Sequence, residues 1–192
     1  SFDYSALGMT HYCPGDVGAL MQIPNMQIVL PGTAKEMDRL MMEAYDNGSP
    51  TYFRLSESSN MVEHEVSFGR AAIVRQGTKA TVIAVGTMLS PVMEAVADLD
   101  VTVLYYTTVR PFDREALLQN MTTNKILLCE PYYTGALTTE LVMTCHDKPI
   151  HLEFVGVPCE IPKTYGTVQE NMSVFGMDAK SIREKTLTLI EA

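Results

Sequence analysis

Apolar and polar positions in the first part of the chain follow two different periods in turn, which predicts helices alternating with strands. Residues 16–21 are expected to form a short helix. Residues 26–30 are an apolar run bounded by prolines, which is typical of a buried strand. A second helix follows, and residues 51–55 form the next strand. Because the connecting turns are short, this order implies a parallel strand–helix–strand unit.

The second helix carries its own boundary signals. Thr33 is a natural N-cap, and Glu36 three residues later predicts a capping box, in which each side chain bonds the other residue's backbone. Asn47-Gly48 is expected to end the helix. Apolar residues share one helical face between these signals, namely Met37, Leu40, Met41, Ala44 and Tyr45.

The later part of the chain repeats the alternation after a more polar stretch. Residues 56–79 are expected to be a linker that leads into a β-hairpin with Gln76-Gly77 at its turn. From Ala80 onward the pattern predicts a separate three-layer α/β core. The expected strands cover 81–85, 101–106, 126–129 and 151–157. The expected helices cover 90–99, 113–120, 135–146 and a final segment capped by Asp178 that runs to Ile190.

Composition narrows the class of protein. Hydrophobic residues make up 46% of the chain and charged residues 19%, as in compact globular proteins. The net charge of −9 repels phosphate backbones and anionic membranes, so neither nucleic-acid nor membrane binding is expected. No apolar run reaches the roughly 20 residues that span a bilayer. The chain opens on Ser1 instead of methionine, from which we expect a trimmed or excerpted product.

The cysteines do not form a recognisable metal or redox motif. Cys13, Cys129, Cys145 and Cys159 are scattered, and no two are spaced as C-x-x-C. Reduced, mostly buried thiols are therefore expected, which favours a cytoplasmic protein. Nothing in the sequence activates the Cys13 thiol, so we interpret it as inert.

His11 is the sharpest candidate for chemistry. It lies on a loop that starts at Gly8, just ahead of the first predicted helix and strand. Loops beyond the carboxyl ends of parallel strands line ligand crevices, and a histidine there can exchange protons with substrate oxygens. Taken alone, a loop histidine is more often structural or solvated.

Other charged residues have competing interpretations. Arg54, at the end of a predicted strand, can bind an anionic substrate or form a salt bridge, for example with Glu57. Glu130 precedes a strand-to-helix turn, where capping of a helix N-terminus is favoured over acid–base chemistry. The segment 110–113 is expected to be architectural.

Metal and phosphate-loop motifs are not found in the sequence. His64, His146 and His151 lack partners at metal-ligand spacing, so a metal site is not expected. Gly86-Thr87 is a bare turn and does not extend to a G-x-G-x-x-G loop.

An ordered set of motifs resembles the carboxy-terminal half of transketolases. The set covers essentially the whole chain in colinear order. Deoxyxylulose-phosphate synthases and the β subunits of 2-oxoacid dehydrogenases share much of it. Its members are Gly8-x-Thr10-His11, Ile23-Pro24-Asn25-Met26, Thr51-Tyr52-Phe53-Arg54-Leu55, Gly69-Arg70-Ala71 leading to residues 80–86, Val109-Arg110-Pro111-Phe112-Asp113, Glu130-Pro131-Tyr132-Tyr133-x-Gly135 and Phe175-Gly176-Met177.

The resemblance implies a fold and a reaction. The fold is α/β, with a partial thiamin-diphosphate pyrimidine-type domain over residues 1–57, a linker and hairpin over 58–79, and a three-layer α/β/α transketolase C-terminal domain over 80–192. The implied reaction is thiamin-diphosphate-dependent transfer of a two-carbon ketol unit between sugars. By position in the motif, the resemblance assigns a catalytic role beside substrate oxygens to His11. Thr10 and Arg54 are expected to bind substrate.

Two positions depart from the family pattern. Where the family has an aspartate that senses acceptor hydroxyls, four residues before the histidine, this chain has Leu7. Where it has a phosphate-gripping arginine, three residues after Arg54, this chain has Glu57. A carboxylate repels a phosphate. Either the substrate is not a typical sugar phosphate, or Arg54 binds the phosphate group instead.

The resemblance also implies segments outside this chain. The family's cofactor-binding glutamate and aromatic residue, and its Gly-Asp-Gly domain for the diphosphate and Mg²⁺, do not occur here. We therefore expect the chain to be inactive alone, as the C-terminal portion of an enzyme or part of a split subunit. Thiamin diphosphate and Mg²⁺ are expected in the complete enzyme, where a homodimer or a partner subunit would supply the segments that bind them. Residues 1–55 are expected to be disorder-prone unless a partner covers them. The alternatives are a non-catalytic assembly or dimerisation module and a 2-oxoacid dehydrogenase β subunit.

Overall fold

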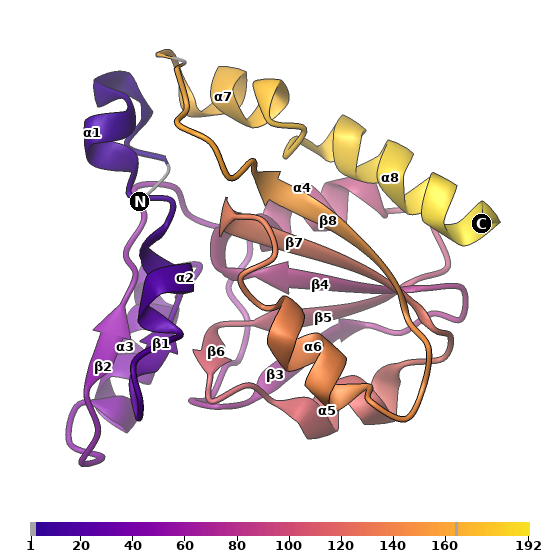
Figure 1. The fold of residues 1–192 in the computed structure, drawn as a ribbon, viewed down its shortest axis with the longest axis horizontal. Helices are drawn as coiled ribbons and strands as arrows, with labels where there is room; N and C mark the ends of the chain where they lie inside the picture. Colours follow the sequence, from indigo (N-terminus) through magenta and orange to yellow (C-terminus); the bar gives the residue numbers. More distant parts are fainter. Residues whose placement is uncertain (1–2, 164) are drawn as a thin grey trace.

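The chain folds into two β-sheets with helices packed around them (Figure 1). A computed structural model describes residues 3–163 and 165–192. The strands are β1 (Gln27–Val29), β2 (Thr51–Phe53), β3 (Ala71–Arg75), β4 (Thr81–Val85), β5 (Thr102–Tyr106), β6 (Thr108–Arg110), β7 (Lys125–Tyr133) and β8 (His151–Val157). The helices are α1 (Met9–Tyr12), α2 (Asp16–Leu20), α3 (Ala34–Ala44), α4 (Leu89–Ala95), α5 (Arg114–Asn120), α6 (Thr138–Thr144), α7 (Val168–Val174) and α8 (Ala179–Glu191), with 3₁₀ turns η1 (Ser5–Leu7) and η2 (Gly86–Met88).

The smaller sheet joins the two parts of the chain. Its strand order is β2-β1-β6, and β1 pairs in parallel with β2 from Gln27 opposite Thr51 to Val29 opposite Phe53. This pairing confirms the predicted parallel strand–helix–strand unit, with α3 as the connecting helix. The third strand, β6, comes from the later part of the chain and pairs antiparallel with β1. The first residues are therefore tied to the later domain by backbone hydrogen bonds.

The N-terminus of α3 differs from the predicted capping box. Thr33 Oγ1 accepts the hydrogen bond of Glu36 N at 3.2 Å, as expected. The Glu36 carboxylate, however, accepts from Gly32 N at 2.8 Å and from the Tyr105 hydroxyl at 2.7 Å, and not from the N-cap backbone. Because the carboxylate binds Gly32 N and the buried Tyr105 hydroxyl of the larger sheet instead, only half of the box forms. Of the predicted apolar face, Leu40 and Ala44 are buried, whereas Tyr45 is exposed.

The larger sheet has the strand order β3-β5-β4-β7-β8, and only β3 runs antiparallel to its neighbour. The hairpin predicted around Gln76-Gly77 is wrong, because β3 pairs with β5 and β4 lies on the other side of β5. All five residues of β4 are buried, while those of β3 are half-buried or exposed. A strand that is apolar throughout takes the covered centre of a parallel sheet, and the partly exposed strand takes the edge.

Helices cover both faces of the larger sheet, which confirms the predicted three layers (Figure 1). Successive residues of a strand point to opposite faces. Val82 and Ala84 share one core cluster with residues of α4 and α8, whereas Ile83 and Val85 share the other with residues of α5 and α6. The predicted N-cap of the last helix is present, since Asp178 Oδ1 accepts from Ser181 N at 2.8 Å. Across the described residues, no helix combines the length and apolarity that crossing a bilayer requires.

Candidate active site

The His11 segment is a single helical turn held out from the body of the protein. It starts at Gly8, whose φ of 71° favours glycine. A Cβ at Gly8 would also lie 2.4 Å from Cε1 of the exposed Tyr165 ring, which would have to move aside. The His11 side chain is exposed, and its Nδ1 lies 2.9 Å from Thr10 Oγ1. The Thr10 hydroxyl thus orients the imidazole and leaves Nε2 facing solvent.

Helix α7 anchors this segment through Tyr12. The Tyr12 ring is fully buried, and its hydroxyl donates to Ser5 O at 2.8 Å. The same hydroxyl accepts a hydrogen bond from Asn171 Nδ2 at 2.9 Å, and Asn171 is a buried residue of α7. The sequence did not predict α7, although Thr167 and Glu170 form a complete capping box at its start. The C-terminal part of the chain therefore fixes the position of the predicted catalytic residue.

Asp16, the first residue of α2, fixes the chain that follows the His11 segment. Its Oδ2 accepts from Arg54 Nε at 2.7 Å and from the Tyr52 hydroxyl at 2.8 Å. The ion pair of Arg54 is thus with Asp16 and not with Glu57. Arg54 is 2% exposed, and its Cζ lies 5.7 Å from the centre of the Tyr132 ring. Arg54 therefore holds the start of α2 against β2, and its predicted contact with substrate stays a prediction.

A groove borders the His11 segment. It has a volume of about 780 Å³ and is lined by residues 3–7, Glu57 and residues 166–170. Both positions that depart from the family pattern, Leu7 and Glu57, line this one groove. Leu7 O accepts from the Thr10 hydroxyl at 3.4 Å, which connects the groove wall to the residue beside His11.

Glu130 has the capping role that was predicted. It is fully buried, and its two oxygens accept from Gly135 N at 2.7 Å and from Leu137 N, the N-cap of α6, at 3.1 Å. Burial raises the pKa of the Glu130 carboxyl to about 7, against the lowering effect of these two donors. Glu130 does not line the groove beside His11.

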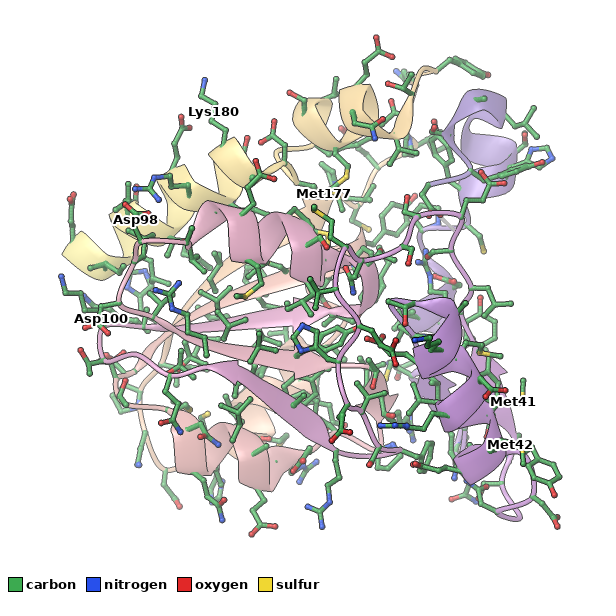
Figure 2. All side chains as sticks on the ribbon, turned by 180° about the vertical axis from the view of Figure 1, so that it is seen from behind. Met41, Met42, Asp98, Asp100, Met177 and Lys180 are labelled. Carbon is green, nitrogen blue, oxygen red and sulfur yellow. The ribbon has the colours of Figure 1, made fainter. Side chains whose placement is uncertain are left out.

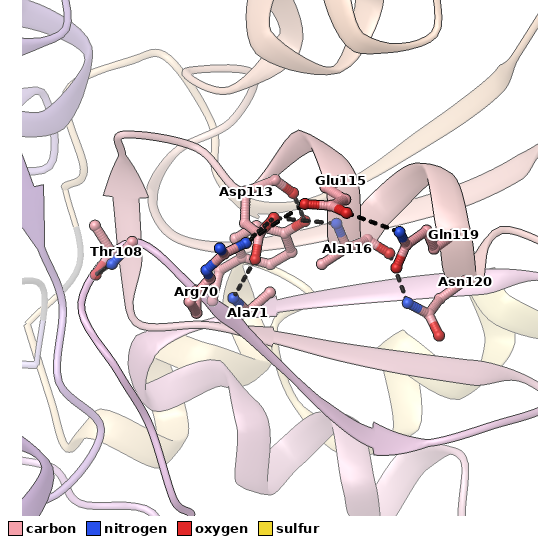
Figure 3. Close-up of polar contacts among 10 residues, drawn as sticks. Arg70, Ala71, Thr108, Asp113, Glu115, Ala116, Gln119 and Asn120 are labelled. Carbon is pink, nitrogen blue, oxygen red and sulfur yellow. Dashed lines mark hydrogen bonds and ion pairs between the residues drawn. The ribbon is translucent and has the colours of Figure 1, made fainter.

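The segment 110–113 is architectural, as expected. Asp113 caps α5 by accepting from Ala116 N at 3.0 Å, and its other oxygen accepts from Ala71 N of β3 at 3.0 Å (Figure 3). Arg70 Nη1 lies 3.9 Å from Asp113 and 3.6 Å from Glu115. This cluster fastens the edge strand β3 to α5 and contributes nothing to the groove.

The cysteines are all free thiols, but only half of them are buried. Cys129 and Cys145 lie in the interior, whereas Cys13 and Cys159 are exposed, so the expectation of mostly buried thiols holds for two of the four. Within the parts of the chain that the structure describes, no three His, Cys, Asp or Glu side chains are grouped to hold a metal ion.

Curated proteins with similar sequences include a transketolase subunit and 1-deoxy-D-xylulose-5-phosphate synthases. The chain is 32% identical over 186 residues to an uncharacterised 33.6 kDa protein in the fasciation locus of Rhodococcoides fascians, covering 95% of this chain and 60% of that protein. It is 27% identical to one of the subunits of the apulose-4-phosphate transketolase of Phocaeicola vulgatus, covering 98% of this chain and 64% of that protein. It is 28% identical to 1-deoxy-D-xylulose-5-phosphate synthase of Haemophilus ducreyi, covering 93% of this chain and 30% of the synthase.

Solved structures show the same fold. A split-gene transketolase described as an inactive β4 tetramer superposes with a TM-score of 0.86 at 23% identity, covering 96% of this chain and 64% of that one. The transketolase of Campylobacter jejuni superposes with a TM-score of 0.76 at 16% identity, covering 98% of this chain and 30% of that one. The chain therefore spans roughly 60% of the length of the first curated relatives and less of the transketolase from C. jejuni.

The sequence model of one protein family matches the larger sheet and its helices. That family is described as the transketolase C-terminal domain, and the match covers residues 69–182, from the edge strand β3 to the start of α8. The match spans more than half of the chain, and the sheet order and three layers agree with the fold that the resemblance implied. The chain belongs to the transketolase C-terminal domain family.

Proposed function

We propose that this chain supplies the substrate-facing part of a thiamin-diphosphate-dependent transketolase-type enzyme, which transfers a two-carbon ketol unit between sugars. One observation carries the proposal: the exposed imidazole of His11 lies next to a groove large enough for a sugar, with its ring 5.7 Å from the ring of Tyr4, which lines that groove. His11 itself is not among the lining residues. Membership in the transketolase C-terminal domain family supports the reaction class. In this proposal the chain is the C-terminal portion of an enzyme or part of a split subunit, and is inactive by itself.

His11 acts on substrate oxygens. An imidazole can both donate and accept a proton in neutral solution. Because the Thr10 hydroxyl occupies Nδ1, the other ring nitrogen, Nε2, is the atom that meets the substrate. Thr10 also stays a predicted substrate ligand, because its side chain is exposed beside the imidazole. Arg54 contributes through Asp16, which it holds in place from the interior.

In this proposal, the segments that bind the cofactor lie outside this chain. Thiamin diphosphate and Mg²⁺ belong to the complete enzyme, and no metal-binding group of side chains is present among the described residues. A partner subunit or a second copy of the chain would supply the cofactor-binding segments. One relative is named as a subunit of a transketolase, and one structural neighbour comes from a split gene.

A non-catalytic assembly module is the second candidate. Leu7 and Glu57, which replace residues that bind substrate in the family, favour it. Exposed apolar side chains on α3 and in the following polar stretch also favour a partner surface. Met42 of α3, its C-cap residue Tyr45, and Met61 are exposed, and Figure 2 shows Met42 at the outer end of the molecule.

The complete protein, with any partner subunit, tests the proposal directly. We expect it to transfer a ketol unit from a ketose to an aldose, and to lose that activity when thiamin diphosphate is withheld. Absence of thiamin-dependent transfer with every segment restored would contradict the proposal and support the assembly role. A requirement for lipoamide as acceptor would indicate a 2-oxoacid dehydrogenase instead.

A further inference from the structure

Tyr4 connects His11 to the groove that borders it. The Tyr4 side chain lines the groove and is 41% exposed. The centre of its ring lies 5.7 Å from the centre of the His11 imidazole, and the two ring planes are tilted by 44°. Tyr4 therefore contacts the imidazole and belongs to the groove at the same time.

The backbone on both sides of Tyr4 is fixed. Asp3 is 6% exposed, and its Oδ2 accepts from Ser58 N at 2.5 Å. Ser5 is also 6% exposed, and its carbonyl oxygen accepts from the Tyr12 hydroxyl at 2.8 Å. An exposed aromatic ring on a fixed backbone offers contact area to a ligand at a small cost in conformational entropy.

The groove beside Tyr4 combines apolar and polar side chains. Leu7, which is 46% exposed, and Val168 supply apolar surface, whereas Glu57 and Thr167 supply oxygen atoms. Small-molecule sites typically pair aromatic and apolar contacts with a few polar groups that fix orientation. A sugar has both kinds of surface, because its carbons present C–H groups between the hydroxyls. The lining of the groove thus matches the chemistry of a sugar chain.

The spacing of the two rings relates Tyr4 to the role proposed for His11. A substrate oxygen that forms a hydrogen bond with the imidazole lies about 3 Å from a ring nitrogen. Apolar groups are in contact when their heavy atoms are about 4 Å apart. With 5.7 Å between the ring centres, the carbons next to that oxygen come within contact distance of the Tyr4 ring when the sugar occupies the groove.

We propose that Tyr4 is a substrate-binding residue, whose ring packs against the C–H groups of a sugar while His11 bonds one of its oxygens. The proposal rests on the proposed function for the identity of the groove as the substrate end of the site. Because the contact is made with carbon and hydrogen, it requires the aromatic ring of Tyr4 and not its hydroxyl. It strengthens binding and takes no part in proton transfer.

Calorimetric titration of the complete, cofactor-loaded protein with D-ribose 5-phosphate, without a ketose donor, tests the contact in the absence of turnover. Tyr4→Ala should weaken binding by about tenfold, because the sugar no longer buries the apolar face of the ring. Tyr4→Phe keeps the ring and should bind within about twofold of wild type. Leu118→Ala alters a side chain of α5 that is 47% exposed and does not line the groove, so this matched control should leave the affinity unchanged.

Steady-state kinetics distinguish contact with the substrate from mere support of the imidazole. Contact predicts that Tyr4→Ala raises KM for the aldose by about tenfold and leaves kcat within about twofold of wild type. A fall in kcat with unchanged affinity would show that Tyr4 only supports His11, and would overturn the inference. Wild-type affinity in Tyr4→Ala, a tenfold loss in Tyr4→Phe, or no binding of the sugar by wild type would overturn it as well.

The failure of this inference and the failure of the proposed function give different results. A wild-type protein that binds the sugar but transfers no ketol unit would refute the proposed function. The calorimetric comparison of Tyr4→Ala with Tyr4→Phe would still decide whether Tyr4 contacts the sugar.

Discussion

At the scale of single residues, local sequence predicts a role well when the partners are local. Glu130 was expected to cap a helix from its spacing alone, and it binds Gly135 and Leu137 a few residues away. The partner of Arg54 was missed because Asp16 lies 38 positions earlier in the chain. No spacing rule connects two residues that only the folded sheet brings together.

Removal of the Asp16 carboxylate should destabilise the protein strongly. Asp16→Ala takes away the acceptor of both Arg54 Nε and the Tyr52 hydroxyl, and leaves the buried guanidinium without its ion pair. Breaking a buried ion pair typically costs about 3–5 kcal/mol. We expect a loss of this size in the free energy of unfolding measured with urea.

An exposed ion pair supplies the control for Asp16. Asp98 pairs with Arg183 at 2.5 Å on the surface (Figure 2), and exposed pairs contribute little. Asp98→Ala should leave the urea midpoint nearly unchanged. If the two variants lost equal stability, the Asp16–Arg54 pair would not be the buried anchor described above.

Glu130 should give the protein a specific dependence of stability on pH. Its pKa is raised from 4.5 to about 7 in the folded state, so the folded protein binds the proton more tightly than the unfolded chain. The contribution is fully present below pH 4.5 and is lost as the pH rises through 7, amounting to about 3 kcal/mol. Urea unfolding of Glu130→Gln between pH 4.5 and 7.5 should show a flatter profile than wild type by that amount. Parallel profiles would show that the Glu130 proton is not linked to folding.

At the scale of elements, apolar runs predicted most strands and the helices between them. Strands β4, β5 and β8 were located within about a residue. β4 and β5 are buried throughout, because a parallel sheet covered on both faces requires continuous apolar segments. The sequence did not predict three elements, namely α1, the short strand β6 and α7. The pairing of β3 was also wrong, because the choice between two neighbouring strands depends on burial and not on sequence order.

Helix α7 should control the order of the His11 segment. Asn171→Ala removes the donor to the Tyr12 hydroxyl, a buried hydrogen bond worth about 1–2 kcal/mol. Amides of residues 8–12 should then exchange with deuterium faster, while those of β4 stay protected. Val174→Ala, an exposed position on the same helix, should change neither rate. Unchanged exchange in residues 8–12 of Asn171→Ala would exclude α7 as the anchor.

At the scale of the whole molecule, the two parts of the chain form one continuous structure. β6 completes the smaller sheet, and the Glu36–Tyr105 hydrogen bond joins α3 to strand β5 of the larger sheet. The alternation of apolar segments predicted the three layers, but not this junction, because β6 has only three residues and its partner strand lies far away in the sequence. The domain limits at 57 and 79 stay predictions.

A second set of contacts lets the C-terminal part of the chain position the His11 segment. Asn171 of α7 and the loop at Tyr165 both contact the His11 segment. The groove likewise takes one wall from residues 3–7 and the other from residues 166–170. A substrate site at this place therefore needs both parts of the chain.

The turnover number of His11→Ala in the complete, thiamin-diphosphate-loaded enzyme tests this account most directly. His146→Ala, an exposed histidine just beyond α6, serves as the matched control. Loss of a proton-transferring side chain typically lowers turnover by about 10²–10⁴-fold. We predict a fall in this range for His11→Ala, with an unchanged melting temperature and with His146→Ala at the wild-type rate. Wild-type turnover in a folded His11→Ala enzyme would contradict the account.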